Sequence, residues 1–144
     1  MVYADSSFLA SLYLPDPKTE VANAYLAGMQ VPVALTAFNR VELRNALRNM
    51  VARHDATSIA VARALSMIES DVNEGLLIER NLDAMKLFKI AERLSSRHAE
   101  QASIRCVDLL HVASAHVLGL QIFLTFDRQQ ATFAHESGLK TPLG

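Results

Sequence analysis

Four acidic residues that are far apart in the sequence, Asp5, Glu42, Asp108 and Asp127, stand where their carboxylates can share one chemical task. Each follows an apolar strand-like run or falls in the first turns of an amphipathic helix pattern. The carboxyl ends of parallel strands meet at one edge of a sheet, so acids that follow separate strands can converge on one point. Carboxylates gathered in one pocket repel one another unless a cation or a proton neutralises them. The pattern therefore indicates a metal site.

The types of these ligands indicate which metal and which reaction to expect. Oxygen ligands without a matching set of Cys and His favour Mg²⁺ or Mn²⁺ over Zn²⁺. A divalent ion makes water nucleophilic near neutral pH and offsets the charge that develops on phosphate oxygens. His111 and His116 share one helix pattern but are five residues apart, which does not align them as a zinc pair, and Cys106 is interpreted as a packed thiol. We therefore expect a metal-dependent nuclease.

Composition is consistent with one intracellular globular domain. The 144 residues have a mass of 15.8 kDa and suit a single domain, residues 1–144, with a core that needs no disulfide staples. A hydrophobic share of 51% with 5 Gly and 4 Pro favours a compact, helix-rich chain. The single cysteine cannot form an internal disulfide, and neither a signal peptide nor a membrane-spanning run is apparent. We expect a cytoplasmic protein that does not enter a membrane.

Hydrophobic periodicity predicts alternating strands and helices. The expected strands cover residues 2–4, 31–35, 76–78 and 121–125. The expected helices cover residues 8–14, 19–27, 38–53, 58–72, 82–97 and 107–118, with a short one through Phe133 and Ala134 and a polar loop or frayed end at 95–103. This alternation predicts a helix-rich α/β fold in three α/β/α layers, with a mostly parallel central sheet.

Four segments, in this order and spacing, resemble the PIN-domain ribonucleases and most closely their small VapC-like toxin members. They are Val2-Tyr3-Ala4-Asp5-Ser6-Ser7, Glu42 early in its helix, Asp108-Leu109-Leu110-His111-Val112-Ala113, and Thr125-Phe126-Asp127-Arg128. Each segment alone is weak evidence, but the four together are fairly specific. The resemblance covers nearly the whole chain and implies a PIN-like fold.

What the resemblance implies is a metal-dependent endoribonuclease that hydrolyses RNA phosphodiester bonds as the toxin of a toxin–antitoxin pair. The four acids would hold one or two Mg²⁺ or Mn²⁺ ions, with Asp5 and Asp108 as the first candidates for direct ligands. Ser7 and Thr125 match hydroxyl positions that support the acidic cluster. The resemblance also implies a small antitoxin partner and a homodimer.

Basic residues suggest RNA contacts, although a net charge of -1 gives no overall positive field. Arg40, Arg44 and Arg48 recur at four-residue spacing, which places them on one helical stripe along which a phosphate backbone can lie. Arg128, next to Asp127, is either a counter-ion or a phosphate contact. A solvated helical face is the competing interpretation of the stripe.

Each acid also has a structural interpretation. Asp5 can cap the first helix, Asp108 can be a first-turn residue, Asp127 can be a turn residue and Glu42 an ordinary helix residue. Aspartyl-phosphate phosphatases and receiver domains also have an Asp after their first strand. Those phosphatases need a second Asp two residues later, where this chain has Ser7, and receivers need an acidic pair and a late lysine. Two further alternatives are a housekeeping RNA-processing PIN nuclease and a PIN-like module that binds RNA or protein without catalysis.

Overall fold

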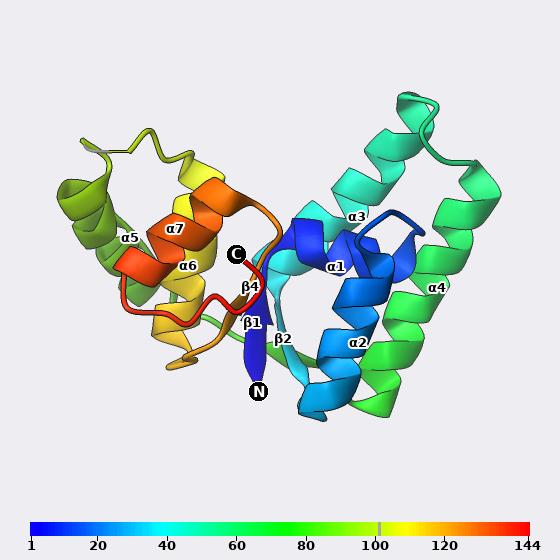
Figure 1. Cartoon of the computed structure of the whole chain (residues 1–144), viewed down its shortest axis with the longest axis horizontal. Helices are drawn as coiled ribbons and strands as arrows, with labels where there is room; N and C mark the ends of the chain where they lie inside the picture. Colours follow the sequence, from blue (N-terminus) through cyan, green and yellow to red (C-terminus); the bar gives the residue numbers. More distant parts are fainter. Residues whose placement is uncertain (101) are drawn as a thin grey trace. The chain divides into compact units, whose positions relative to one another are not determined.

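The computed structural model of the chain describes residues 1–100 and 102–144, and it divides into two compact units. Unit 1 contains Met1 and Ser6–Arg80, whereas unit 2 contains Val2–Asp5 and Asn81–Gly144. Figure 1 shows the helices and strands of each unit in sequence colours. The two units are described separately below.

Unit 1 consists of four helices and a pair of parallel strands. The elements are α1 (Ser6–Tyr13), α2 (Thr19–Met29), β2 (Val33–Thr36), α3 (Ala37–Ala52), α4 (Ser58–Glu74) and β3 (Leu77–Arg80). Strand β2 pairs with β3 in parallel, with Val33 opposite Leu77. Helix α1 packs against α2, α3 and α4, as Figure 1 shows. The fully buried side chains Phe8, Leu43 and Ile68 belong to these helices, which explains their apolar spacing.

Local capping sets the helix boundaries of unit 1. Helix α3 begins with a capping box in which the Thr36 side chain accepts a hydrogen bond from the Asn39 backbone N–H at 3.1 Å. Helix α4 begins at a similar cap from Thr57 and ends at Gly75, whose φ of 78° is easily adopted only without a side chain. Helix α2 runs past Gly28 to Met29, and Gln30 takes the left-handed conformation instead.

Unit 2 combines the first strand of the chain with its carboxyl-terminal segment, Asn81–Gly144. Its elements are β1 (Val2–Ala4), α5 (Ala84–His98), α6 (Cys106–Val117), β4 (Phe123–Leu124) and α7 (Arg128–Glu136). Strands β1 and β4 pair in parallel, with Tyr3 opposite Phe123, and these two rings also stack with centroids 5.5 Å apart. Tyr3, Val112, Phe123 and Phe133 belong to one buried cluster. This cluster fixes the strand pair whose carboxyl ends carry Asp5 and Thr125.

The helix-rich α/β class is confirmed, since the four strands of residues 1–100 and 102–144 lie in parallel pairs and are separated by helices. Every expected strand and helix is present, with boundaries that shift by a few residues. The main difference is β4, which spans only Phe123–Leu124 instead of the expected 121–125. The expected polar loop at 95–103 begins later, because α5 continues to His98, and its position 101 lies outside the described residues.

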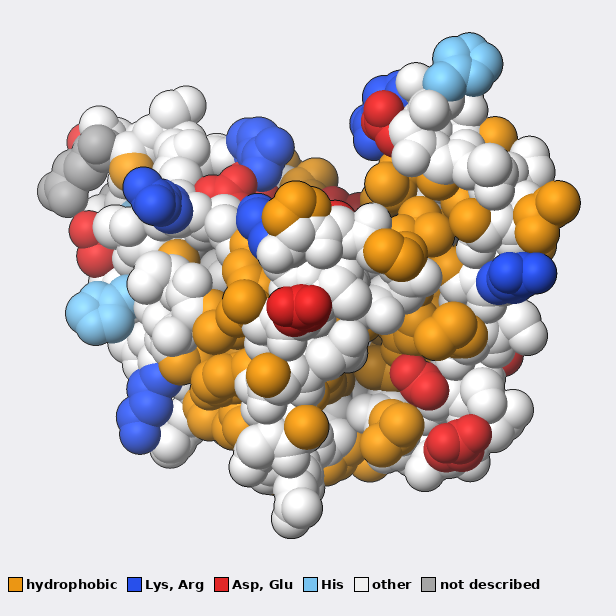
Figure 2. Space-filling view, turned by 45° about the vertical axis from the view of Figure 1, so that its right-hand side comes forward, with side chains coloured by type: hydrophobic (Ala, Val, Ile, Leu, Met, Phe, Trp, Pro, Cys, Tyr) orange, Lys and Arg blue, Asp and Glu red, His pale blue; other side chains and the backbone are white. Residues whose placement is uncertain are grey.

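The described surface carries mixed charge. On the face that Figure 2 shows, hydrophobic side chains form continuous areas and both basic and acidic side chains are scattered around them, in line with a net charge of -1. None of the described helices combines the length and hydrophobicity required to cross a lipid bilayer.

Candidate metal centre

Asp5 and Thr125 are held together at the carboxyl ends of the paired strands β1 and β4. The Asp5 backbone N–H donates to Leu124 O at 3.0 Å and thereby continues the strand ladder by one residue. The Asp5 and Thr125 side chains are almost fully buried, at 3% and 1% exposure. The Thr125 hydroxyl donates to Asp5 Oδ2 at 2.7 Å. A hydrogen bond to a carboxylate is about twice as strong as one between neutral groups, so Thr125 fixes one oxygen of Asp5.

Asp127 is linked to the same threonine and also caps a helix. Its backbone N–H donates to Thr125 Oγ1 at 3.0 Å. Its Oδ1 accepts from the Gln130 backbone N–H at 3.0 Å, which makes Asp127 the N-cap of α7. The structural interpretation predicted a turn residue at Asp127, and the structure shows a helix cap that uses one oxygen, whereas the other, Oδ2, lies 3.5 Å from Arg105 Nη2. A capping role and a role in the acidic site thus use different atoms.

Asp108 lies in the first turn of α6 and forms a bidentate ion pair with Arg105, three residues earlier. Arg105 Nε donates to Oδ2 at 2.7 Å and Nη2 donates to Oδ1 at 3.1 Å. The Asp108 side chain is 15% exposed and that of Arg105 is 72% exposed, so the pair joins a largely covered carboxylate to a solvated cation. Because Nη2 also approaches Asp127, one guanidinium bridges two of the predicted ligands.

These contacts test whether the acids of unit 2 suit a divalent cation. A positive group already lies against both Asp108 and Asp127, which shows that their oxygens can face one cation. The donors are carboxylate oxygens, the type that Mg²⁺ and Mn²⁺ prefer. The residues therefore fit such an ion. Within residues 1–100 and 102–144, no group of three or more His, Cys, Asp and Glu side chains is arranged to hold a metal as it stands. The metal site remains a prediction.

Gln130 completes the polar surroundings of Thr125. Its side chain is 3% exposed, and its Oε1 lies 3.2 Å from the Thr125 hydroxyl. Since that hydroxyl carries one proton, which the shorter contact directs to Asp5, Gln130 serves mainly to pack the threonine in place. Its Nε2 is one of two buried polar side-chain atoms in the described part of the chain that have no hydrogen-bond partner.

Glu42 lies in unit 1, in the second turn of α3. Its Oε2 accepts a hydrogen bond of 2.5 Å from the Ser6 hydroxyl, and Ser6 directly follows Asp5 in the sequence. The sequence predicts Ser7 as the supporting hydroxyl. Ser7 is exposed, and its backbone carbonyl accepts from the Ser11 hydroxyl at 3.2 Å. The supporting role of Ser7 remains a prediction, and the neighbouring Ser6 also contacts a predicted acid, Glu42.

Two of the three arginines on the α3 stripe are paired with acids of their own unit. Arg40 contacts Glu69 at 2.9 Å and Glu79 at 3.1 Å, and Arg44 also contacts Glu69. Burial, followed by repulsion from the neighbouring arginines, lowers the pKa of the Arg44 guanidinium. Arg48 is exposed, as is Arg128 at the start of α7. RNA contact by any of these four arginines remains a prediction, with Arg48 and Arg128 the more accessible.

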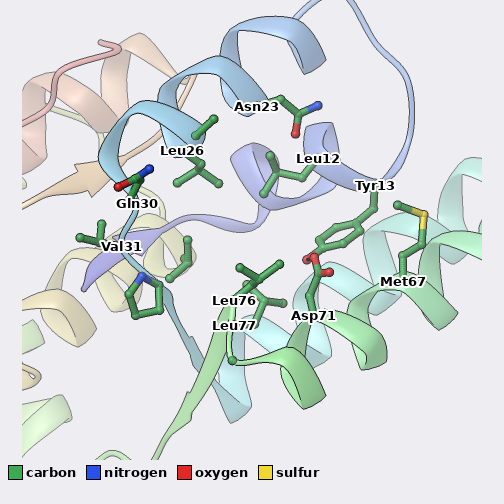
Figure 3. A pocket seen from close by; sticks show the side chains of 14 residues that line it. Leu12, Tyr13, Asn23, Leu26, Gln30, Val31, Met67, Asp71, Leu76 and Leu77 are labelled. Atoms are coloured by element: carbon green, nitrogen blue, oxygen red, sulfur yellow. Dashed lines mark hydrogen bonds between the residues drawn. The ribbon is translucent and has the colours of Figure 1, made fainter.

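Unit 1 also contains an apolar pocket of about 620 Å³ that the sequence did not reveal. Helices α1, α2 and α4 and the strand ends supply its lining, which includes Leu26, Val31 and Leu76 (Figure 3). The Tyr13 hydroxyl donates to Asp71 Oδ2 at 2.7 Å at its wall. Burial and the Asp71 carboxylate raise the pKa of Tyr13 above its usual range, so the phenol stays protonated. None of the four predicted acids lines this pocket.

Sequence reasoning missed Ser6, Arg105 and Gln130 around the predicted acids. Arg105 had a detectable signal, because Arg and Asp three residues apart at a helix start lie side by side. Ser6 and Gln130 had none, since their contacts depend on how distant segments pack.

Comparison with known proteins assigns the chain to a family. Residues 2–136 match the family model of the PIN domain. The chain therefore belongs to the PIN domain family. No curated protein matches the sequence significantly.

Three solved structures share the fold at low sequence identity. VapC20 from Mycobacterium tuberculosis, described as a Sarcin-Ricin loop cleaving toxin, has a TM-score of 0.68 and 20% identity, over 92% of this chain and 94% of that one. VapBC2 from Rickettsia felis, bound to a promoter DNA fragment, has a TM-score of 0.67 and 16% identity, over 98% and 97%. FitAcB from Neisseria gonorrhoeae has a TM-score of 0.66 and 16% identity, over 98% and 96%. At these identities the likeness establishes the fold alone.

Proposed function

We propose that this chain is a divalent-metal-dependent endoribonuclease and the toxin of a toxin–antitoxin pair. The observation that carries the proposal is the linked set formed by Asp5 and Asp127, which follow β1 and β4, and Asp108 in the first turn of α6, in a chain of the PIN domain family. The toxin role is supported by the fold shared with VapC20, which is described as a Sarcin-Ricin loop cleaving toxin.

In this proposal Asp5, Asp108 and Asp127 hold Mg²⁺ or Mn²⁺, and Glu42 is the fourth acid by its place in the family resemblance. The bound cation supplies a water of lowered pKa and offsets negative charge on the phosphate. Thr125 keeps one oxygen of Asp5 fixed and positions the backbone of Asp127. Fixed carboxylates reduce the reorganisation needed when the reaction begins.

The partners follow from the same family resemblance. RNA is the proposed substrate, a small antitoxin the proposed protein partner, and a homodimer the proposed assembly in the cytoplasm. A PIN-like module that only binds RNA or protein is the competing function, and so is a housekeeping RNA-processing nuclease. Growth arrest on expression, relieved by co-expression of a small protein encoded next to this chain, separates the toxin from the housekeeping role.

The deciding experiment is cleavage of end-labelled single-stranded and structured RNA in EDTA, Mg²⁺ or Mn²⁺. We expect cutting only with metal, and a loss of at least about a hundredfold in Asp108→Asn, since catalytic electrostatic contacts are commonly worth that much. Asp55→Asn is the matched control, because Asp55 is also paired with a nearby arginine, Arg53 at 3.0 Å, on an exposed surface. Equal cleavage by Asp108→Asn and wild type would exclude the proposed site.

A further inference from the structure

We propose that Arg105 is an internal latch on the metal centre, which holds Asp108 and Asp127 in the metal-free protein and competes with the divalent cation for their oxygens. The inference rests on the proposed function and adds a residue that sets how tightly the metal binds. It is a positioning residue, because it acts through the two carboxylates.

The guanidinium group of Arg105 contacts the carboxylates of both Asp108 and Asp127. Arg105 binds both oxygens of Asp108, at 2.7 and 3.1 Å, and reaches Oδ2 of Asp127 at 3.5 Å. The other oxygen of Asp127 is occupied by the cap of α7. Arg105 therefore occupies the three carboxylate oxygens of these two residues that the helix cap does not use. A divalent ion that binds there must share or displace the guanidinium.

Electrostatic repulsion favours displacement of the Arg105 guanidinium by the metal ion. Two neighbouring carboxylates repel each other in the absence of a counter-ion, so a resident cation stabilises the metal-free protein. A metal ion and a guanidinium on the same oxygens repel each other, so the two cations compete. Removing the arginine relieves this repulsion and leaves the carboxylates open to the metal.

The position of Arg105 makes the latch easy to open. Its side chain is 72% exposed, so it can swing into solvent without disturbing the buried cluster of unit 2. Arg105 also occupies the N-cap position of α6 and makes no capping hydrogen bond with its side chain. A cation is unfavourable at the positive end of a helix dipole, and this opposes the attraction of the two acids. The ion pair of Arg105 thus orders the carboxylates of Asp108 and Asp127, and a divalent metal ion can replace it.

A purely structural role makes the opposite prediction. If Arg105 only orients Asp108 for the metal, its removal disorders a ligand and weakens metal binding. If it is a latch, its removal strengthens metal binding and destabilises the metal-free protein. Metal affinity in the absence of RNA therefore separates the two roles without any measurement of activity.

The test is calorimetric titration of Mn²⁺ into EDTA-treated, dialysed protein, with thermal melting in EDTA alongside. The variants are Arg105→Gln, which removes the charge, and Arg105→Lys, which keeps it. Arg97→Gln is the charge-matched control, since Arg97 is exposed near the end of α5 in the same unit. We expect Arg105→Gln to bind Mn²⁺ roughly two- to fivefold more tightly than wild type, the range that an ion pair worth up to about 1 kcal/mol provides. Arg105→Lys and Arg97→Gln should stay near the wild-type affinity, and Arg105→Gln should melt at a lower temperature in EDTA.

Two results would overturn the latch and are distinguishable from each other. If the wild-type protein binds Mn²⁺ and Arg105→Gln binds it equally or more weakly, Arg105 is not a latch. The proposed nuclease site is then unaffected. Absence of Mn²⁺ binding by wild type and every variant removes the metal centre itself, and with it both proposals. Because Arg105 is largely exposed, folding of the variants is expected, and far-UV circular dichroism checks it.

Discussion

The hydroxyl of Thr125 offers the sharpest test of how the acidic site is held. Thr125→Val keeps the shape of the side chain but removes the donor to Asp5 Oδ2 and the acceptor of the Asp127 N–H. Both side chains of the Thr125–Asp5 pair are nearly fully buried, so water cannot easily replace the lost group. The perturbation therefore acts on two hydrogen bonds, one of them to a charged group.

The expected cost follows from those two bonds. A hydrogen bond to a charged group contributes about 1.5–3 kcal/mol and a neutral one about 1 kcal/mol, and part of the sum is recovered by relaxation, so we expect a loss of about 2–3 kcal/mol. For a chain of 144 residues the entropy of unfolding corresponds to about 3 °C per kcal/mol, which predicts a fall in melting temperature of about 6–9 °C.

The assay is urea unfolding and thermal melting in EDTA, followed by circular dichroism. Thr125→Ser keeps the hydroxyl and loses one buried methyl group, which costs about 1 kcal/mol. Thr132→Val is the control, because Thr132 is exposed on α7 and bonds only the Arg128 carbonyl of the preceding turn in the described contacts. If Thr125→Val is as stable as wild type, or more stable than Thr125→Ser, the hydroxyl does not hold Asp5 as argued.

Two further predictions concern pH and salt. Burial, then repulsion by Arg93, lowers the pKa of His116, so the native state disfavours the proton that the unfolded chain accepts near its ordinary pKa of about 6.5. The stability that neutral His116 contributes at pH 7.5 is therefore lost as the pH falls below about 6.5. In urea unfolding, His116→Gln should lose less free energy of unfolding than wild type between pH 7.5 and 5. Identical pH profiles of the two proteins would contradict this. Arg48→Ala should weaken RNA binding and reduce the slope of log affinity against log salt by about 0.7, as expected for one phosphate contact on a single strand. Arg44→Ala should mainly lower stability, because Arg44 is paired with Glu69. If Arg48→Ala leaves the salt dependence of RNA affinity unchanged, the arginine stripe of α3 is a solvated face.

Much of the fold was predictable because its signals are local. Apolar runs predicted four strands, and apolar spacing at the helical period predicted the helices between them. Boundaries were also readable where a cap is encoded nearby, as at Thr57 and Gly75 of α4. The short β4 and the extension of α2 past Gly28 were not, because pairing partners and tertiary packing decide where such elements end.

The candidate site was only half predictable. The sequence singles out Asp5, Asp108 and Asp127 as candidates because each stands at a strand end or helix start, and their role as metal ligands remains a prediction. Their hydrogen-bond partners were harder to predict. The contact of Ser6 with Glu42 was not predictable, because it requires knowledge of which face of α1 is buried, and the supporting role of Ser7 stays a prediction.

The sequence by itself thus determined the elements, the α/β class and the acids, since all three depend on residue type and spacing along the chain. Only the tertiary structure decided that Thr125 holds Asp5, that Asp127 uses one oxygen in a helix cap and the other toward Arg105, and that Arg105 bridges Asp108 and Asp127. Hydrogen bonds and ion pairs form over about 3 Å, a precision that spacing along the chain does not provide. That precision comes from the packed strands β1 and β4 and the helices that follow them.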